Sequence, residues 1–84
     1  MCNKLVGLVM LEIDKNKLQA FGKKLSDIRK QANMSQEELA HKSGIDRSYI
    51  SGIERGNRNV ALLNILKLAD ALEIDVAVLF SKIN

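Results

Sequence analysis

The segment from Gln36 to Arg55, QEELAHKSGIDRSYISGIER, contains the residues of this chain best suited to recognise a ligand. Arg47, Ser48 and Tyr49 are consecutive and follow Asp46, a residue type that favours the start of a helix. An arginine guanidinium can donate two hydrogen bonds to O6 and N7 of one guanine, whereas a serine hydroxyl can bond several bases with less selectivity. Tyr49 could stack on a thymine methyl or a sugar, donate to phosphate, or pack against its own domain. These residue types in this order predict base contacts in the DNA major groove.

Further polar and cationic residues stand at the edges of the same segment. Amide, hydroxyl and cationic groups bind backbone phosphates, and such contacts position a domain on the duplex without identifying its sequence. We expect phosphate contacts from Gln36, Ser51, Asn57 and Arg58, with Arg55 and Lys42 as further candidates. For Arg55 and Lys42, simple solvation is an equal alternative.

The basic charge of the chain coincides with this segment. Residues 15–58 contain ten Lys or Arg against five Asp or Glu, whereas residues 1–14 and 59–84 each carry a net charge of −1. A net charge of +3 over the whole chain is weak evidence for nucleic-acid binding, so its distribution is more informative. A normally solvated surface is the alternative that charge alone leaves open.

The candidate contacts need two short helices that cross at a tight turn. Ala40 is small enough for a close approach of two backbones, and Gly44 is suited to the left-handed conformation of a sharp turn. Ile45, Ile50 and Ile53 then supply apolar anchors. This spacing predicts a helix-turn-helix whose second helix is held away from the body of the domain. An ordinary helical hairpin is the alternative.

Local signals extend this prediction to an all-α domain. Ser35 with Glu38 forms a capping box, Asp46 suits the start of the next helix, and Asn33 and Gly56 suit helix ends. We expect helices at about Lys17 to Ala32, Ser35 to Lys42, Arg47 to Glu54 and Asp75 to Phe80, with a further helix whose core stripe is Leu62, Ile65, Leu66, Ala69 and Leu72.

The last two expected helices carry more apolar surface than one small core absorbs. One domain of 84 residues also has little stability to spare, which favours oligomerisation. We therefore expect a dimer interface formed by Leu63, Leu68, Val76, Val78 and Phe80. A fully intramolecular core is the alternative.

Residues 1–14 precede the patterned part of the chain and include the apolar run LVGLVMLEI. This run could be an arm or a helix on a partner subunit, or a weakly ordered extension, and Met10 could be the true translation start. We therefore divide the chain into an N-terminal extension of uncertain order, residues 1–14, and a DNA-binding domain with C-terminal dimerisation helices, residues 15–84.

Composition excludes several other classes of protein. Cys2 is the single cysteine and His41 the single histidine, so neither an internal disulfide nor a zinc site is expected. No stretch approaches the roughly 20 apolar residues that cross a bilayer, and no cleavage motif follows the N-terminal apolar run. We expect a cytoplasmic protein without a metal, a cofactor or a small-molecule ligand. Since a phosphate-binding glycine loop and a nucleophile–base motif are also missing, we do not expect an enzyme.

From Phe21 to Phe80 the chain resembles the lambda-repressor and Cro-like (XRE-type) helix-turn-helix regulators, through the frame SQEELA, then G, then IERG. The run SGIDRSYISGIERGNRN most resembles the recognition segment of the controller proteins of restriction-modification systems. The resemblance implies a five-helix lambda-repressor-like domain with base contacts at Arg47 and Ser48 and a backbone contact at Gln36. It also implies that Arg29 and Glu54 pair to brace the motif.

The resemblance further implies a homodimer on a near-palindromic double-stranded operator, because one recognition helix reads too few base pairs to find one site in a genome. A controller of this kind regulates its own promoter and recruits RNA polymerase. Glu37 and Glu38 could touch polymerase, but they are also ordinary first-turn residues favoured by the helix dipole. A phage-type repressor and an autoregulatory antitoxin are the alternatives.

Overall fold

The computed structural model describes the backbone of residues 4–81 and the side chains of residues 14–81. Every regular element in this part of the chain is a helix, which confirms the all-α prediction. The helices are α1 (Lys4–Gln31), α2 (Gln36–Ser43), α3 (Arg47–Glu54), α4 (Leu62–Leu72) and α5 (Val76–Phe80).

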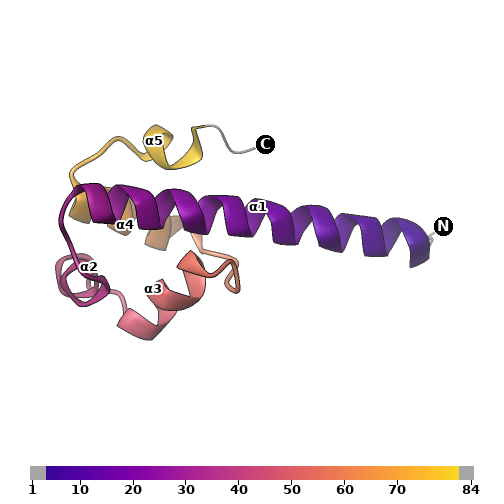
Figure 1. The fold of residues 1–84 in the computed structure, drawn as a ribbon, viewed down its shortest axis with the longest axis horizontal. Coiled ribbons are helices and arrows are strands. Elements are labelled where there is room, and N and C mark those ends of the chain that lie inside the picture. Colours follow the sequence, from indigo (N-terminus) through magenta and orange to yellow (C-terminus); the bar gives the residue numbers. More distant parts are fainter. Residues whose placement is uncertain (1–3, 82–84) are drawn as a thin grey trace.

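Helix α1 forms the long axis of the molecule (Figure 1). The pair α2 and α3 lies on one side of it, α5 lies on the other, and α4 lies behind. The 28 residues of α1 span about 42 Å, close to the longest extent of the molecule, 46 Å. The N-terminal half of α1 therefore projects past the other helices.

The start of α1 differs from the expected position. The helix begins at Lys4 rather than near Lys17, so residues 4–14 continue it without a break. The polar run at Asp14–Lys17 and the glycine at position 7 interrupt the apolar pattern, but neither interrupts helical backbone, because only proline strongly does so. The division of the chain at residue 15 stays a prediction, and Cys2 lies outside the described residues.

The ends of the helices follow the local signals. Ser35 accepts a hydrogen bond from the Glu38 amide while the Glu38 side chain accepts one from the Ser35 amide, which is the predicted capping box. Asn33 and Gly44 adopt positive φ angles of 57° and 72°, as a sharp stop requires. Gly56, with φ of 76°, ends α3 as expected.

The hydrophobic core lies between α1 and the four shorter helices. Its buried members come from every helix and from the turn after α2: Phe21, Leu25, Leu39, Ile45, Ile50, Ile53, Leu68, Ala69, Leu72 and Leu79. Nine of these ten residues are aliphatic, and Phe21 is the exception.

Helix α4 faces the core with a different set of residues from the expected stripe. Leu62 and Leu66 are 69% and 41% exposed, whereas Leu68 is fully buried. The core stripe is Ile65, Leu68, Ala69 and Leu72, which is also a helical i, i+3, i+4, i+7 pattern. Two overlapping stripes exist in this leucine-rich helix, and packing against α2 and α5 selects the second.

This orientation corrects the predicted dimer interface. Leu68 is a core residue and cannot pair with another subunit, while Val76 is half-buried against the core. Leu63, Val78 and Phe80 are exposed, so their role in a dimer stays a prediction.

Helices α1 and α3 cross closely at Gly22. A Cβ on Gly22 would lie 2.8 Å from the Glu54 carbonyl oxygen and would also meet the carbonyl of Ile53. The absent side chain therefore sets how near α3 lies to α1.

Candidate nucleic-acid interface

The first turn of α3 is exposed while its inner face is anchored. Ile50 and Ile53 are 0% and 1% exposed in the core. Asp46 accepts hydrogen bonds from the Ser48 amide at 3.0 Å and from the Ser48 hydroxyl at 3.1 Å, which caps the helix as predicted. The exposed Arg47 and Ser48 are therefore carried at the start of a short, capped helix.

Arg47 is held only lightly in the free protein. Its Nε lies 3.9 Å from Glu37 Oε1, and the two side chains are 59% and 79% exposed. An ion pair this long and this exposed contributes little. The guanidinium is thus available to a guanine edge at small cost.

Tyr49 is half-buried and makes contacts on two sides. The guanidinium carbon of Arg58 lies 5.7 Å from the centroid of its ring, within range of a cation–π interaction. Tyr49 also lines an open hollow together with Ile45, Asn64 and Lys67. The ring is therefore packed in its own domain along part of its surface, one of the alternatives left open by the sequence.

A buried ion pair braces the motif. Arg29 Nε and Nη2 donate to the two carboxylate oxygens of Glu54 at 2.7 and 3.0 Å, and Arg29 Nη1 donates to the Met34 carbonyl at 2.7 Å. The side chains of Arg29 and Glu54 are 10% and 7% exposed. The predicted pairing is confirmed, and it fixes the last turn of α3 to α1 and to the turn before α2.

The protonation of this pair follows from its surroundings. Burial by itself would raise the pKa of Glu54, but hydrogen bonds from Arg29, Gln36 and Ser26, with the Arg29 charge, hold that pKa below its usual value. The hydrogen bond to Glu54 likewise raises the pKa of Arg29 against the effect of burial. Both groups are therefore charged at neutral pH.

Gln36 belongs to the same network. Its Nε2 donates to Glu54 Oε1 at 3.0 Å, a contact that the sequence did not indicate. An amide group carries two N–H donors, so one remains for another acceptor. The predicted phosphate contact of Gln36 stays a prediction, now with a side chain already oriented by Glu54.

The other predicted phosphate contacts occupy different positions around the motif. Lys42, Arg55, Asn57 and Arg58 are exposed, and Ser51 is half-buried on α3. Ala40 is half-buried against the core, and its role at a close approach of two backbones stays a prediction. The structure thus brings Arg47, Ser48 and Ser51 onto α3 and places Arg58 at Tyr49.

Asn64 and Lys67 are candidate contacts that the sequence analysis missed. They line the hollow beside Tyr49 although they belong to α4. The available signal was a pair of polar residues spaced i, i+3 in an otherwise leucine-rich helix, which places both on one face.

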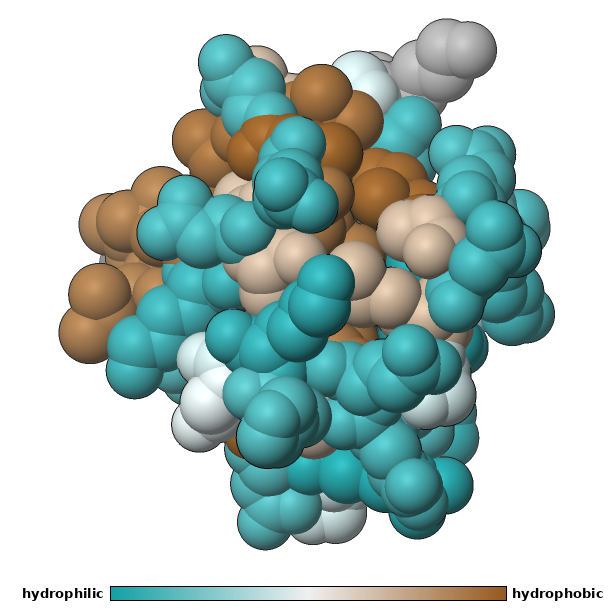
Figure 2. All heavy atoms as spheres, turned by 90° about the vertical axis from the view of Figure 1, so that its left-hand side faces the viewer, coloured by the Kyte–Doolittle hydropathy of each residue, from teal (hydrophilic) through white to brown (hydrophobic). Residues whose placement is uncertain are grey.

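Polar and apolar residues are segregated on the surface. Figure 2 shows hydrophobic residues gathered over the upper and left parts, where α5 and α4 lie, and mainly hydrophilic residues over α2 and α3 below. Among the described residues, no group of three His, Cys, Asp or Glu is placed to hold a metal ion. Within the described residues, no helix is both long enough and apolar enough to span a lipid bilayer.

Comparison with known proteins places this arrangement in a family. The helix-turn-helix family matches residues 25–79. The control protein C.MunI of Mycoplasma sp is 45% identical over 64 residues, which cover 75% of this chain and 86% of that protein. The control protein C.BamHI of Bacillus amyloliquefaciens is 53% identical over 55 residues, covering 64% of this chain and 68% of that protein. The chain belongs to the helix-turn-helix family of restriction-modification controller proteins.

Solved controller proteins have the same fold. The controller protein C.AhdI from Aeromonas hydrophila is 56% identical with a TM-score of 0.74, covering 75% of this chain and 96% of that chain. The controller protein C.Esp1396I, solved as a tetramer in complex with its natural 35 base-pair operator, is 37% identical with a TM-score of 0.73, covering 80% of this chain and 88% of that chain. The predicted five-helix lambda-repressor-like fold is confirmed.

Proposed function

We propose that this controller protein binds a near-palindromic DNA operator as a homodimer and regulates transcription of a restriction-modification system. The observation that carries the proposal is the exposed, capped first turn of α3, with Arg47 lightly held and Ser48 beside it. The braced Arg29–Glu54 pair supports it, because a recognition helix must keep its orientation to read base edges. In this role the protein acts in the cytoplasm and has no catalytic activity.

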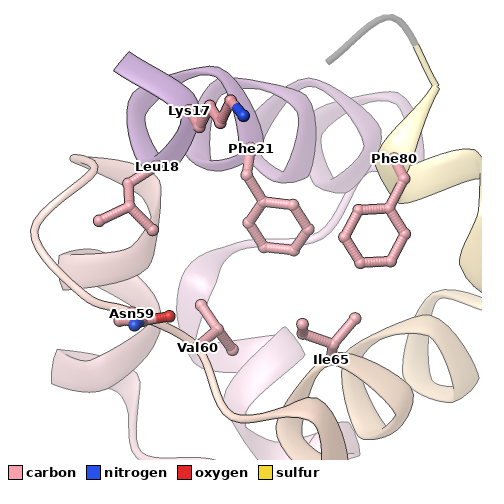
Figure 3. Close-up of a pocket in the computed structure, with 7 residues that line it drawn as sticks. All are labelled: Lys17, Leu18, Phe21, Asn59, Val60, Ile65 and Phe80. Atoms are coloured by element: carbon pink, nitrogen blue, oxygen red, sulfur yellow. The ribbon is translucent and has the colours of Figure 1, made fainter. Parts of the chain in front are cut away.

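An exposed apolar face supports the dimer. Its members are on α4 and α5 and are between 40% and 69% exposed: Leu62, Leu63, Leu66, Val78 and Phe80. Next to this face is a hollow of about 270 Å³, which Phe80 also lines (Figure 3). The rings of Phe21 and Phe80 lie with their centroids 5.6 Å apart at this hollow. Pairing two such faces about a two-fold axis would cover the face and present two copies of α3 to one side of the duplex.

A contact with RNA polymerase is the finer part of this proposal. Of the two candidate carboxylates, Glu38 is occupied by the capping box at Ser35. Glu37 is 79% exposed and only weakly paired with Arg47, so it is the better placed of the two.

Selection from random duplexes tests the proposal. We expect the purified protein to enrich an inverted repeat with half-sites about one helical turn apart. The Arg47→Ala variant is the control, because it should bind the enriched site less tightly while retaining binding to unrelated duplexes. Enrichment of no inverted repeat would refute the proposed function.

A further inference from the structure

Gly52 lies in the middle of α3 and is buried. A glycine inside a helix makes the helix less stable than an alanine would at the same position. A Cβ placed on Gly52 would lie 2.9 Å from Cγ and 3.3 Å from Nε of Arg58. All three of the nearest atoms belong to the Arg58 side chain, and none belongs to the backbone of a neighbouring helix. The missing side chain of Gly52 therefore makes room for the side chain of Arg58, whereas that of Gly22 makes room for the backbone of α3.

Arg58 follows α3 in the chain but its side chain is directed back along the helix. Its stem passes Gly52, and its guanidinium carbon lies 5.7 Å from the centroid of Tyr49. Tyr49 and Gly52 are three residues apart and thus share one side of α3. The Asn57 amide donates to the Gly52 carbonyl at 2.9 Å, which fixes the direction of the chain immediately before Arg58.

We propose that Gly52 is a positioning residue for DNA binding. The space left by its missing side chain, which we call the Arg58 seat, holds the Arg58 side chain so that its guanidinium lies against Tyr49. This inference rests on the proposed function. An unrestrained arginine loses rotamer freedom when it binds DNA, whereas a seated arginine has already lost much of it. The seat also keeps a second guanidinium within one helical turn of the residues that read bases.

The substitution Gly52→Ala tests this inference in the full chain. Its Cβ would displace the Arg58 stem without removing any charge, and alanine favours the helix. We expect affinity for the selected operator to fall by about 2- to 10-fold, with an unchanged helical circular dichroism spectrum. The dependence of affinity on salt should stay as in the wild type, because the Arg58 charge remains.

Tyrosine fluorescence gives a second readout that does not depend on DNA. Tyr49 is the single tyrosine and the chain has no tryptophan, so its emission reports the contact with Arg58 directly. We expect Gly52→Ala to change the emission of the free protein in the same direction as Arg58→Ala. Arg47→Ala should leave the emission unchanged, because residues two apart on a helix do not face each other.

The double variant decides between positioning and an unrelated effect. If Gly52 acts through Arg58, adding Gly52→Ala to Arg58→Ala should cause no further loss of affinity. Wild-type emission and affinity in Gly52→Ala, or fully additive losses in the double variant, would overturn the inference. A wild-type protein that selects no operator would refute the proposed function instead, while the fluorescence comparison would still test the seat.

Discussion

Replacing Glu54 with alanine should strongly destabilise this controller protein, because the substitution breaks a buried ion pair. The substitution removes the acceptor of two hydrogen bonds from Arg29 and one from Gln36, and it leaves the Arg29 charge in a site where its side chain is only 10% exposed. Breaking one partner of a buried pair costs about 3–5 kcal/mol. A domain of this size has a total stability of roughly 4–13 kcal/mol.

Urea unfolding followed by circular dichroism at fixed protein concentration measures this loss. The matched control is the double variant Arg29→Met with Glu54→Leu, because apolar side chains of similar volume need no partner. We expect the double variant to be more stable than Glu54→Ala alone. A loss below about 1 kcal/mol in the single variant, or a double variant that is less stable still, would refute the idea that the pair braces the motif.

Four further outcomes follow from the structure. The folded pKa of Glu54 lies below its usual value, so the ionised carboxylate stabilises the fold fully above the unfolded pKa of about 4.3. This stabilisation is lost as pH falls through the folded pKa. The acid unfolding curves of the wild type and of Glu54→Gln should therefore converge at low pH. Gly22→Ala should cost about 1–3 kcal/mol in urea unfolding, since its Cβ would meet the backbone of α3, and an unchanged midpoint would contradict the close crossing. Glu73→Gly should raise the unfolding free energy by about 0.5–1 kcal/mol, because Glu73 has φ of 56° at the end of α4, whereas Glu73→Ala should give no such gain. Arg47→Ala should lose about 1–3 kcal/mol of binding energy on the operator in gel-shift titrations, and equal weakening on all duplexes would argue against base reading.

Signals contained within a few residues predicted the structure well. The capping box at Ser35, the cap at Asp46 and the turn at Gly44 each depend on one or two residue types and on backbone groups no more than four residues away. Such features form wherever their sequence occurs, provided that the flanking segments are helical. For this reason the helix-turn-helix and its exposed first turn were accessible from the sequence.

Apart from the Arg29–Glu54 pair, which the family resemblance implied, features that depend on distant segments were not accessible from the sequence. Two apolar stripes compete in α4, and only packing against α2 and α5 decides that Leu68 is buried while Leu62 and Leu66 are exposed. Nothing in the local sequence distinguishes the surroundings of Gly22 from those of Gly52. In the structure, a Cβ on Gly22 would meet the backbone of α3, whereas a Cβ on Gly52 would meet the side chain of Arg58. The hydrogen bond from Gln36 to Glu54 spans eighteen residues, so no local rule could indicate it.

The brace between Arg29 and Glu54 lies wholly within one chain, and this has a consequence for how the protein responds to its own abundance. Each monomer therefore positions its own α3 without a partner, so association with a second monomer would only have to supply the other half of the proposed operator. Occupancy of that operator would then rise with the square of the monomer concentration when dimers are scarce. Transcription controlled in this way would change steeply over a narrow range of protein concentration.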